Sequence, residues 1–356
     1  MKLKTDKVLL RNFFYLLLLT ISGCIETFEP TVNLDTSPIV ITGVITDLNP
    51  AQVEIAKPVT GYTKQSSIQR ISGATVLLFD DQGNQEQLTE IRNGYYQGTS
   101  KGVVGRKYHI NVQLPNNDII SSSPQLLKPC PSIDSLSLEQ IKYLKPFGKI
   151  KVEINGLNLN LYMNNSDTLS RYYKWKIGGT YKRLSPLSVD TCYVTMPTHS
   201  HFVLGESVSK DTDLLWKKLK YIKADGTYTE GHSVEVSQYS LTKEAYDYWK
   251  KIEDQQNNLG SVFDPPPTQI IGNLSYIDDQ NVPVLGFFEV SSIKKKRIFI
   301  TIDNFLDLSE ELIASFIRDL NYKCYPILLD FMPPRWCSDC SLIENSTKVK
   351  PSYWPE

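Results

Sequence analysis

The chain has 356 residues, of which 41% are hydrophobic, and a formal net charge of -1. Its 38 basic and 39 acidic residues form neither the basic field that nucleic-acid binding requires nor a polyacidic tract, so we expect partners to be recognised through shape and local chemistry. The length leaves room for two domains with hydrophobic cores, and the frequent Tyr, Val, Ile and Thr residues indicate a mainly β fold.

The N-terminus has the pattern of an export signal. Four basic residues precede an apolar segment at 13–19, which is too short to span a membrane. Small residues then precede Cys24, as they do in a bacterial lipobox. We therefore expect residues 1–23 to be a signal peptide and Cys24 to be acylated, with residues 24–37 as a lipidated tether. An ordinary signal peptide in which Cys24 is incidental is the alternative.

Short strand patterns recur at regular spacing over residues 38–128. About seven apolar runs are separated by turn signals, of which Asn93-Gly94 is the strongest because both residues tolerate the positive φ of a tight hairpin. The stretches "GATVLLFDDQGN" and "GRKYHINV" in this region resemble small prealbumin-like or carboxypeptidase-regulatory-like modules. Such modules usually act in binding or as spacers between domains, and not in catalysis. We therefore predict an antiparallel β-sandwich of that type for the N-terminal domain.

A second β-rich domain is predicted over residues 129–322, after a proline-containing boundary. Its longer alternating runs favour a second antiparallel β-sandwich with one or two inserted helices. The first helix is expected at 242–257, with Thr242 as its N-cap, and the second at 308–320. We expect the aromatic residues of the first helix to pack in a core rather than to line a ligand site.

One strand of this second domain shows the alternation clearly. Tyr173, Trp175 and Ile177 share one face, and Tyr172, Lys174 and Lys176 share the other. Because neighbouring side chains of a strand point to opposite faces, the pattern predicts a core face for the apolar residues and a solvated face for the lysines.

The tail at 323–356 is rich in Cys and Pro and contains a Cys-x-x-Cys motif. Such a motif can be a redox centre, half of a zinc site or a structural disulfide. Adjacent prolines and the lack of a βαβ pattern disfavour redox chemistry, and no histidine lies close enough in sequence to complete a zinc site. We favour a structural bridge within the tail, because exported proteins enter an oxidising compartment. The connectivity stays open among five candidates: Cys130, Cys192, Cys324, Cys337 and Cys340.

Motifs for catalysis and cofactor binding are absent from the sequence. It contains no Gly-x-Ser-x-Gly elbow, phosphate-binding loop, His-Glu-x-x-His helix or dinucleotide fingerprint. His199 and His201 could share a strand face, but no third metal ligand is evident nearby. We therefore expect no enzyme activity, cofactor or metal. A carboxylate pair drawn from Glu153, Glu235 and Asp264 is the remaining route to a hydrolase.

Two short segments resemble an Asp-Ser/Thr-apolar acceptor for O-glycosylation in Bacteroidetes. They lie at 134–136 and 167–169, with Ser135 and Thr168 as the candidate modified residues. Motifs of this length arise often by chance, so ordinary turn residues are the favoured interpretation.

Three blocks carry a family resemblance that extends over nearly the whole chain. They are "LGSVFDPPPTQ" at 259–269, "CSDC" at 337–340 and "KPSYW" at 350–354. With the lipobox, they resemble a large family of Bacteroidetes outer-membrane lipoproteins classified only as a domain of unknown function (DUF4249). Typical members also carry a cysteine near the position of Tyr276, and its absence here fits the odd cysteine count.

The family offers no established enzymatic activity or catalytic residue to transfer. Its members resemble accessory lipoproteins found beside TonB-dependent transporters. The resemblance therefore implies a non-enzymatic outer-membrane lipoprotein, anchored through N-terminal acyl chains, that is a partner of such a transporter or of another barrel complex. The cell surface is the expected location, with the periplasmic face as the alternative. A glycan-binding or substrate-binding lipoprotein that acts alone is the second hypothesis, and a hydrolase is the third.

Overall fold

A computed structural model describes much of the chain from residue 38 onwards. The described residues are 38–58, 68–147, 150–164, 170–185, 187–188, 190–196, 202–207, 214–223, 230–257, 268–304, 324 and 335–355. Several predictions fall outside these ranges, namely the acylated Cys24 with its tether, Thr168, the pair His199 and His201, and the second helix at 308–320.

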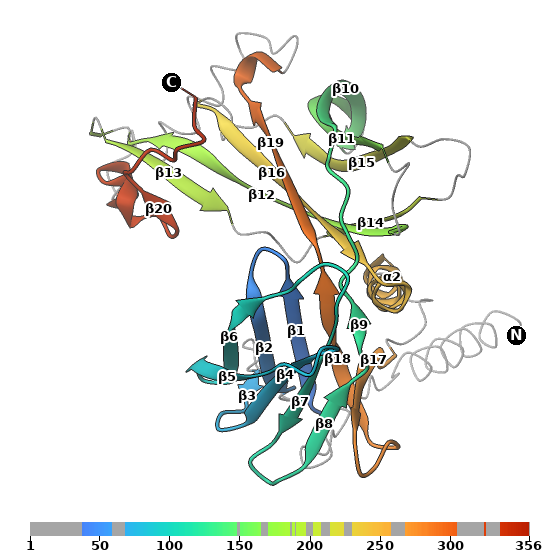
Figure 1. The fold of residues 1–356 in the computed structure, drawn as a ribbon. Helices are drawn as coiled ribbons and strands as arrows, with labels where there is room; N and C mark the ends of the chain where they lie inside the picture. The colour runs from blue at the N-terminus through green and yellow to red at the C-terminus, as the bar shows by residue number, and fades with distance from the viewer. Residues whose placement is uncertain are drawn as a thin grey trace, which may run out of the picture. The chain divides into compact units, whose positions relative to one another are not determined.

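The described residues form three sheets and one α-helix (Figure 1). The first sheet contains β1 (Val40–Thr46), β2 (Pro50–Lys57), β3 (Gln69–Arg70), β4 (Thr75–Asp80), β5 (Gln85–Arg92), β6 (Tyr95–Lys101), β7 (Lys107–Gln113), β8 (Ile119–Ser122), β9 (Gln125–Leu126), β17 (Ile271–Tyr276) and β18 (Pro283–Ser291). The second contains β10 (Ser135–Phe147), β11 (Ile150–Asn164) and β15 (Leu214–Lys223). The third contains β12 (Tyr172–Leu184), β13 (Thr191–Met196), β14 (Phe202–Glu206), β16 (His232–Leu241), β19 (Ile293–Ile300) and β20 (Ser346–Thr347). The helix is α2 (Lys243–Asn257), and short 3-10 turns are η3 (Ile302–Asn304), η4 (Arg335–Cys337) and η5 (Cys340–Leu342).

Nine strands of the first sheet close into a barrel. Their order is β1-β18-β17-β8-β7-β4-β5-β6-β2, and β2 pairs back onto β1. Every pairing in the ring is antiparallel except that of β1 with β18, which is parallel. Alternation directs apolar side chains inward, and Ile41, Ile55, Ile110, Ile120 and Phe288 are fully buried. The interior of the barrel is therefore a packed core.

The prediction of two β-sandwich domains, the first prealbumin-like or carboxypeptidase-regulatory-like, is wrong. The strands of residues 38–128 leave two open edges, β1 and β8. Both edges are taken by β18 and β17, which come from residues 271–291, and the ring closes through them (Figure 1). Full closure leaves no unpaired edge in the ring, whereas a sandwich keeps edges in both of its sheets.

The other two sheets share a second core. Leu157, Leu159 and Leu161 of β11 are fully buried. They belong to one cluster with Tyr173 and Trp175 of β12, so the apolar face predicted for that strand is confirmed. This cluster is separate from the core of the barrel.

Helix α2 lies where the sequence predicts the first helix. Thr242 caps it, because the Ala245 N–H donates to the Thr242 Oγ1 at 3.2 Å. Ala245 is buried in a third apolar cluster with Leu241 and with Phe287 of β18. The helix therefore packs against the outer face of a barrel strand. None of the helices in the described ranges is long and apolar enough to cross a membrane.

Two disulfides confirm the prediction of structural bridges and give their connectivity. Cys340 bonds to Cys192 of β13 and Cys337 bonds to Cys324, with Cα–Cα distances of 5.8 and 5.5 Å. The two cysteines of the Cys-x-x-Cys motif are therefore not bonded to each other. One bridge lies within the tail and the other attaches the tail to the six-stranded sheet. Cys130 is a buried free thiol.

Peptide mapping of the non-reduced protein is expected to give two cross-linked pairs, 192 with 340 and 324 with 337. Cys130 should react with a thiol reagent only after unfolding, because its side chain is buried and burial raises its pKa to about 11. A cross-link between Cys337 and Cys340 would contradict this connectivity.

Closure of the barrel requires a glycine at position 286. A Cβ on Gly286, whose φ is +97°, would lie 2.0 Å from the Ile41 backbone oxygen on the paired strand. Gly83 is a matched control, because its φ is +84° but nothing lies within 4 Å of its Cβ position. Gly83→Ala should cost about 1–3 kcal/mol through backbone strain alone. Gly286→Ala should lower the free energy of unfolding, measured in urea, by roughly 3 kcal/mol more than Gly83→Ala does. Equal losses in the two variants would contradict the steric argument.

Candidate ligand pocket

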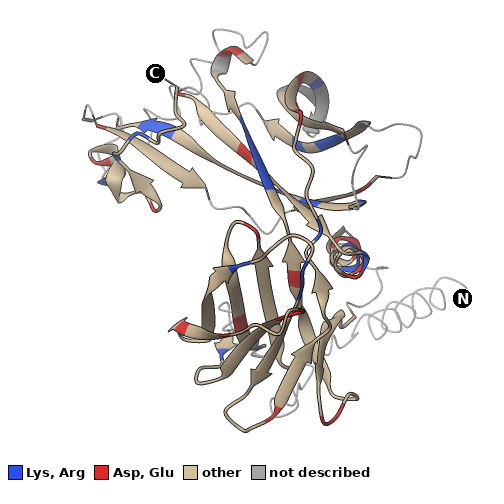
Figure 2. Cartoon of the chain, in the orientation of Figure 1, with Lys and Arg blue, Asp and Glu red and all other residues tan. Residues whose placement is uncertain are grey.

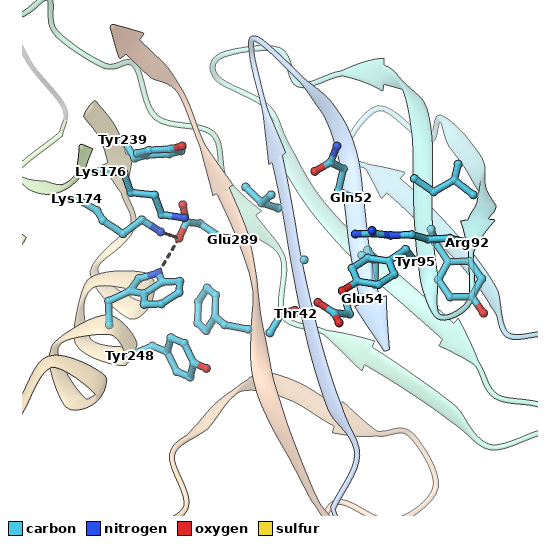
Figure 3. A pocket seen from close by; sticks show the side chains of 17 residues that line it. Thr42, Gln52, Glu54, Arg92, Tyr95, Lys174, Lys176, Tyr239, Tyr248 and Glu289 are labelled. Atoms are coloured by element: carbon cyan, nitrogen blue, oxygen red, sulfur yellow. Dashed lines mark hydrogen bonds and ion pairs between the residues drawn. The ribbon is translucent and has the colours of Figure 1, made fainter. Parts of the chain in front are cut away.

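A pocket of about 380 Å³ lies between the outside of the barrel and the elements α2, β12 and β16. Strands β1 and β18 both contribute residues to its lining. Figure 3 shows two groups of side chains on either side of Thr42, one with Lys174, Glu289 and Tyr248 and the other with Gln52, Arg92 and Tyr95. The lining residues are Thr42, Gly43, Val44, Gln52, Val53, Glu54, Ile91, Arg92, Tyr95, Tyr96, Lys174, Lys176, Tyr239, Tyr248, Trp249, Phe287 and Glu289.

Strand β18 supplies side chains to both sides of the barrel wall. Phe288 and Val290 point into the barrel core, and Phe287 belongs to the cluster under α2. Alternation then places Glu289 on the outer face with Phe287. Glu289 is nevertheless only 3% exposed, because the covering elements shield this face from water.

A buried ion pair joins the barrel to the six-stranded sheet at this point. Lys174 of β12 donates to the carboxylate of Glu289, and both side chains are 3% exposed. The Trp249 indole N–H donates to the same carboxylate oxygen at 2.6 Å, and Ser291 Oγ donates to the other oxygen at 2.8 Å. Lys174 Nζ also lies 4.0 Å from the Trp249 ring centroid. The carboxylate is therefore satisfied from three elements: β12, α2 and β18 itself.

Burial and charge act in opposite directions on these two groups. Burial lowers the pKa of Lys174 to about 8, although the Glu289 carboxylate acts to raise it. Burial alone would raise the pKa of Glu289, but the charge and hydrogen bond of Lys174 outweigh it and hold that pKa below its usual value. The pair is therefore charged at neutral pH, with each ion depending on the other.

The solvated face predicted for Lys174 is wrong, since this residue is 2% exposed. Lys176, two positions along the same strand, is half-buried and also lines the pocket. Its Nζ lies 5.8 Å from the centroid of the Tyr239 ring. No carboxylate of the described residues forms an ion pair with Lys176. Glu289 therefore pairs with Lys174 and not with Lys176.

The barrel wall of the pocket carries a second, more exposed charge cluster. The Arg92 guanidinium lies 3.8 Å from the centroid of the Tyr95 ring. Glu54 pairs with Arg70 at 3.1 Å, and Arg70 also donates to the Tyr95 hydroxyl at 2.7 Å. Both carboxylates that line the pocket are therefore already held by basic partners.

This arrangement suits binding better than acid–base catalysis. A glycosidase needs two carboxylates that face one reacting bond. Glu235, one of the predicted candidates, lies on β16 and pairs with Lys295 and Arg297. Asp264 and the Glu153 side chain lie outside the described part of the structure. In the described ranges, no three His, Cys, Asp or Glu side chains are grouped so that they could hold a metal ion.

Other predicted site residues lie away from this pocket. Ser135 is exposed at the start of β10, and none of the candidate cysteines lines the pocket. The sequence predicts that the helix aromatics pack in a core rather than line a ligand site. Tyr248 and Trp249 do both, because they pack on the cluster under α2 and also line the pocket. Sequence reasoning missed the pair of Lys174 and Glu289; the one signal was a charged residue inside an apolar strand.

A run of four basic residues on β19, blue in Figure 2, makes several contacts within the protein. Lys295 and Arg297 pair with Glu235 on the neighbouring strand. Lys296 donates to the backbone oxygens of Ile133 and Asp134, at 3.2 and 2.5 Å. Three of the four basic side chains are therefore engaged in contacts within the protein.

The ion pair can be tested with a double-mutant cycle. Lys174→Met or Glu289→Gln alone should each cost about 3–5 kcal/mol, because each leaves a buried charge without its partner. The double variant should recover most of that loss, since it leaves no unpaired charge. If the double variant loses as much free energy of unfolding in urea as the two single variants together, the two groups do not interact.

The same variants give a pH test with a defined sign. The folded-state pKa of Glu289 lies below its ordinary value of 4.5, so the carboxylate contributes stability above that pH. This contribution is lost as the pH falls through the lowered folded-state pKa. The difference in the free energy of unfolding between the wild type and the Glu289→Gln variant should therefore become smaller as the pH is lowered below 4.5, which urea unfolding at several pH values would measure.

Comparison with known proteins identifies one family. A profile described as "Domain of unknown function (DUF4249)" matches residues 25–297. No curated protein and no solved structure matches the chain. The profile covers well over half of the 356 residues and confirms the family resemblance, so the chain belongs to the DUF4249 family.

Proposed function

We propose that the protein is a non-catalytic, lipid-anchored outer-membrane protein that binds a ligand and works as an accessory subunit of a TonB-dependent transporter or another barrel complex. The observation that carries the binding role is the pocket beside β18. Its two carboxylates are held in ion pairs, while aromatic rings and the ammonium of Lys176 remain available to a ligand. Such a lining can recognise and orient a molecule without supplying an acid and a base.

Membrane attachment is the second part of the proposal, and sequence features support it. Basic residues, a short apolar segment and small residues precede Cys24 in the order of a lipobox. Several acyl chains on Cys24 would hold the protein stably on a membrane, whereas one chain alone binds only marginally. Residues 24–37 would then separate the folded body from the lipid surface, with the cell surface as the favoured side.

The partnership with a barrel transporter rests on the resemblance to accessory lipoproteins. A tethered body with a ligand pocket fits this role, because the tether keeps the pocket close to the membrane that the ligand must cross. A binding lipoprotein that acts alone is the competing arrangement, and the two differ in whether a barrel stays bound.

Purification of the tagged protein from its native membrane in mild detergent tests this proposal. We expect an outer-membrane barrel to co-purify and to be identified by mass spectrometry. The matched control is the same tagged protein with Cys24→Ala, which should lose its lipid and leave the membrane fraction.

Two results would count against the proposal, each against a different part. A Cys24→Ala variant that stays in the membrane fraction would contradict the lipid anchor. Wild-type protein that purifies without a barrel would contradict the partnership and favour a binding protein that acts alone.

A further inference from the structure

The pocket has an excess positive charge beside the buried ion pair. Lys174 and Lys176 lie on the same face of β12, and Glu289 is the carboxylate near both of them. One carboxylate can neutralise only one ammonium group, and Lys174 already holds it in a hydrogen-bonded pair. Lys176 is half-buried as a residue, so we expect water to screen its charge less than that of an exposed lysine. The side of the pocket that carries these three residues therefore has one positive charge in excess, which a negatively charged group of a ligand could neutralise.

Aromatic rings line the pocket together with Lys176. The rings are those of Tyr239, Tyr248, Trp249 and Phe287, and the Lys176 Nζ lies 5.8 Å from the Tyr239 ring centroid. Tyr248 stacks on Phe287 with ring centroids 4.9 Å apart, and Trp249 packs edge-on against Tyr248 at 5.4 Å. These contacts hold the rings in place before any ligand arrives, which lowers the entropic cost of binding.

We infer that the pocket binds a small aryl carboxylate, with its carboxylate paired to Lys176 and its ring placed among Tyr239, Tyr248 and Trp249. The inference rests on the proposed binding function and names the ligand class for that pocket. A flat ring matches the largely carbon surface of the aromatic side chains. A single carboxylate brings the two ammonium groups and Glu289 to electrical balance.

A hydroxyl-rich ligand such as an acidic sugar fits this lining less well. A sugar needs many hydrogen-bond partners, and its hydroxyl groups lose hydrogen bonds to water on burial. The aromatic side chains of the lining present mainly ring carbon, and the Glu289 oxygens are already occupied by Lys174, Trp249 and Ser291. The volume of about 380 Å³ lies at the small end of the range for ligand pockets, which favours a compact ligand.

The inference can be tested with 2-naphthoate as the probe and the full lipoprotein in detergent, by ligand-observed NMR and calorimetry against a detergent blank. The neutral amide of the same shape, 2-naphthamide, should bind at least about tenfold more weakly, because it cannot form the charge-assisted bond to Lys176. Cyclohexanecarboxylate, which keeps the charge without the aromatic ring, should also bind more weakly.

Variants on β12 separate a local role of Lys176 from a general charge effect. Lys176→Gln should weaken naphthoate binding at least about tenfold and leave naphthamide binding unchanged. Lys182→Gln is the control, because Lys182 lies on the same strand but does not line the pocket. This control should bind naphthoate like the wild type, and thermal unfolding should show that both variants are folded.

Three outcomes would overturn the inference. They are equal binding of naphthoate and naphthamide, equal losses in the two lysine variants, and binding of D-glucuronate in preference to naphthoate. None of them bears on whether a barrel co-purifies, so failure of the ligand class can be told apart from failure of the proposed partnership. Loss of the barrel partner would likewise leave the naphthoate result standing.

Discussion

The parallel pairing of β1 with β18 is the contact on which the rest of the structure depends. It joins Val40–Thr46 to Leu285–Ser291 and closes the ring that the N-terminal strands leave open. It also fixes both faces of β18, with Phe288 in the barrel core and Phe287 under α2. After Ser291 the chain passes directly into β19 of the six-stranded sheet, where Asp47 accepts hydrogen bonds from Ser292 and Ile293. One continuous segment therefore belongs to the barrel, the pocket and the second core.

The buried ion pair defines the geometry of the pocket more clearly than it adds to stability. Removal of two ions from water costs energy that their attraction repays only when the geometry is good, and apolar residues of similar volume are often as stable. Here Glu289 receives donors from Lys174, Trp249 and Ser291, so it ties β12 and α2 to β18 at one point. Because the Trp249 indole is one of these donors, the ion pair also fixes the position of an aromatic ring that lines the pocket.

Local features of the fold could be predicted from the sequence, whereas closure of the barrel could not. Thr242 caps α2 as expected, and β5 and β6 meet at the Asn93-Gly94 turn, although only Gly94 has a positive φ, of 70°. These features depend on neighbouring residues. Barrel closure depends on β17 and β18, which lie far along the chain, and short strands with turn signals look alike in a sandwich and in a barrel. Gly286 marks the closure point, but its close approach to Ile41 is visible only after the two strands are paired.

The candidate site was hidden from the sequence for the same reason. Alternation assigns Lys174 correctly to the face opposite Trp175, but it does not show what covers that face. A lysine on the second face of a strand is expected to be solvated, and only the approach of β18 and α2 reverses this expectation. Lys176, two residues further along, is only half-buried and forms no ion pair with a carboxylate of the described residues. The same alternating pattern therefore produces one lysine that is buried in an ion pair and one that is half-buried, and the difference depends on long-range packing.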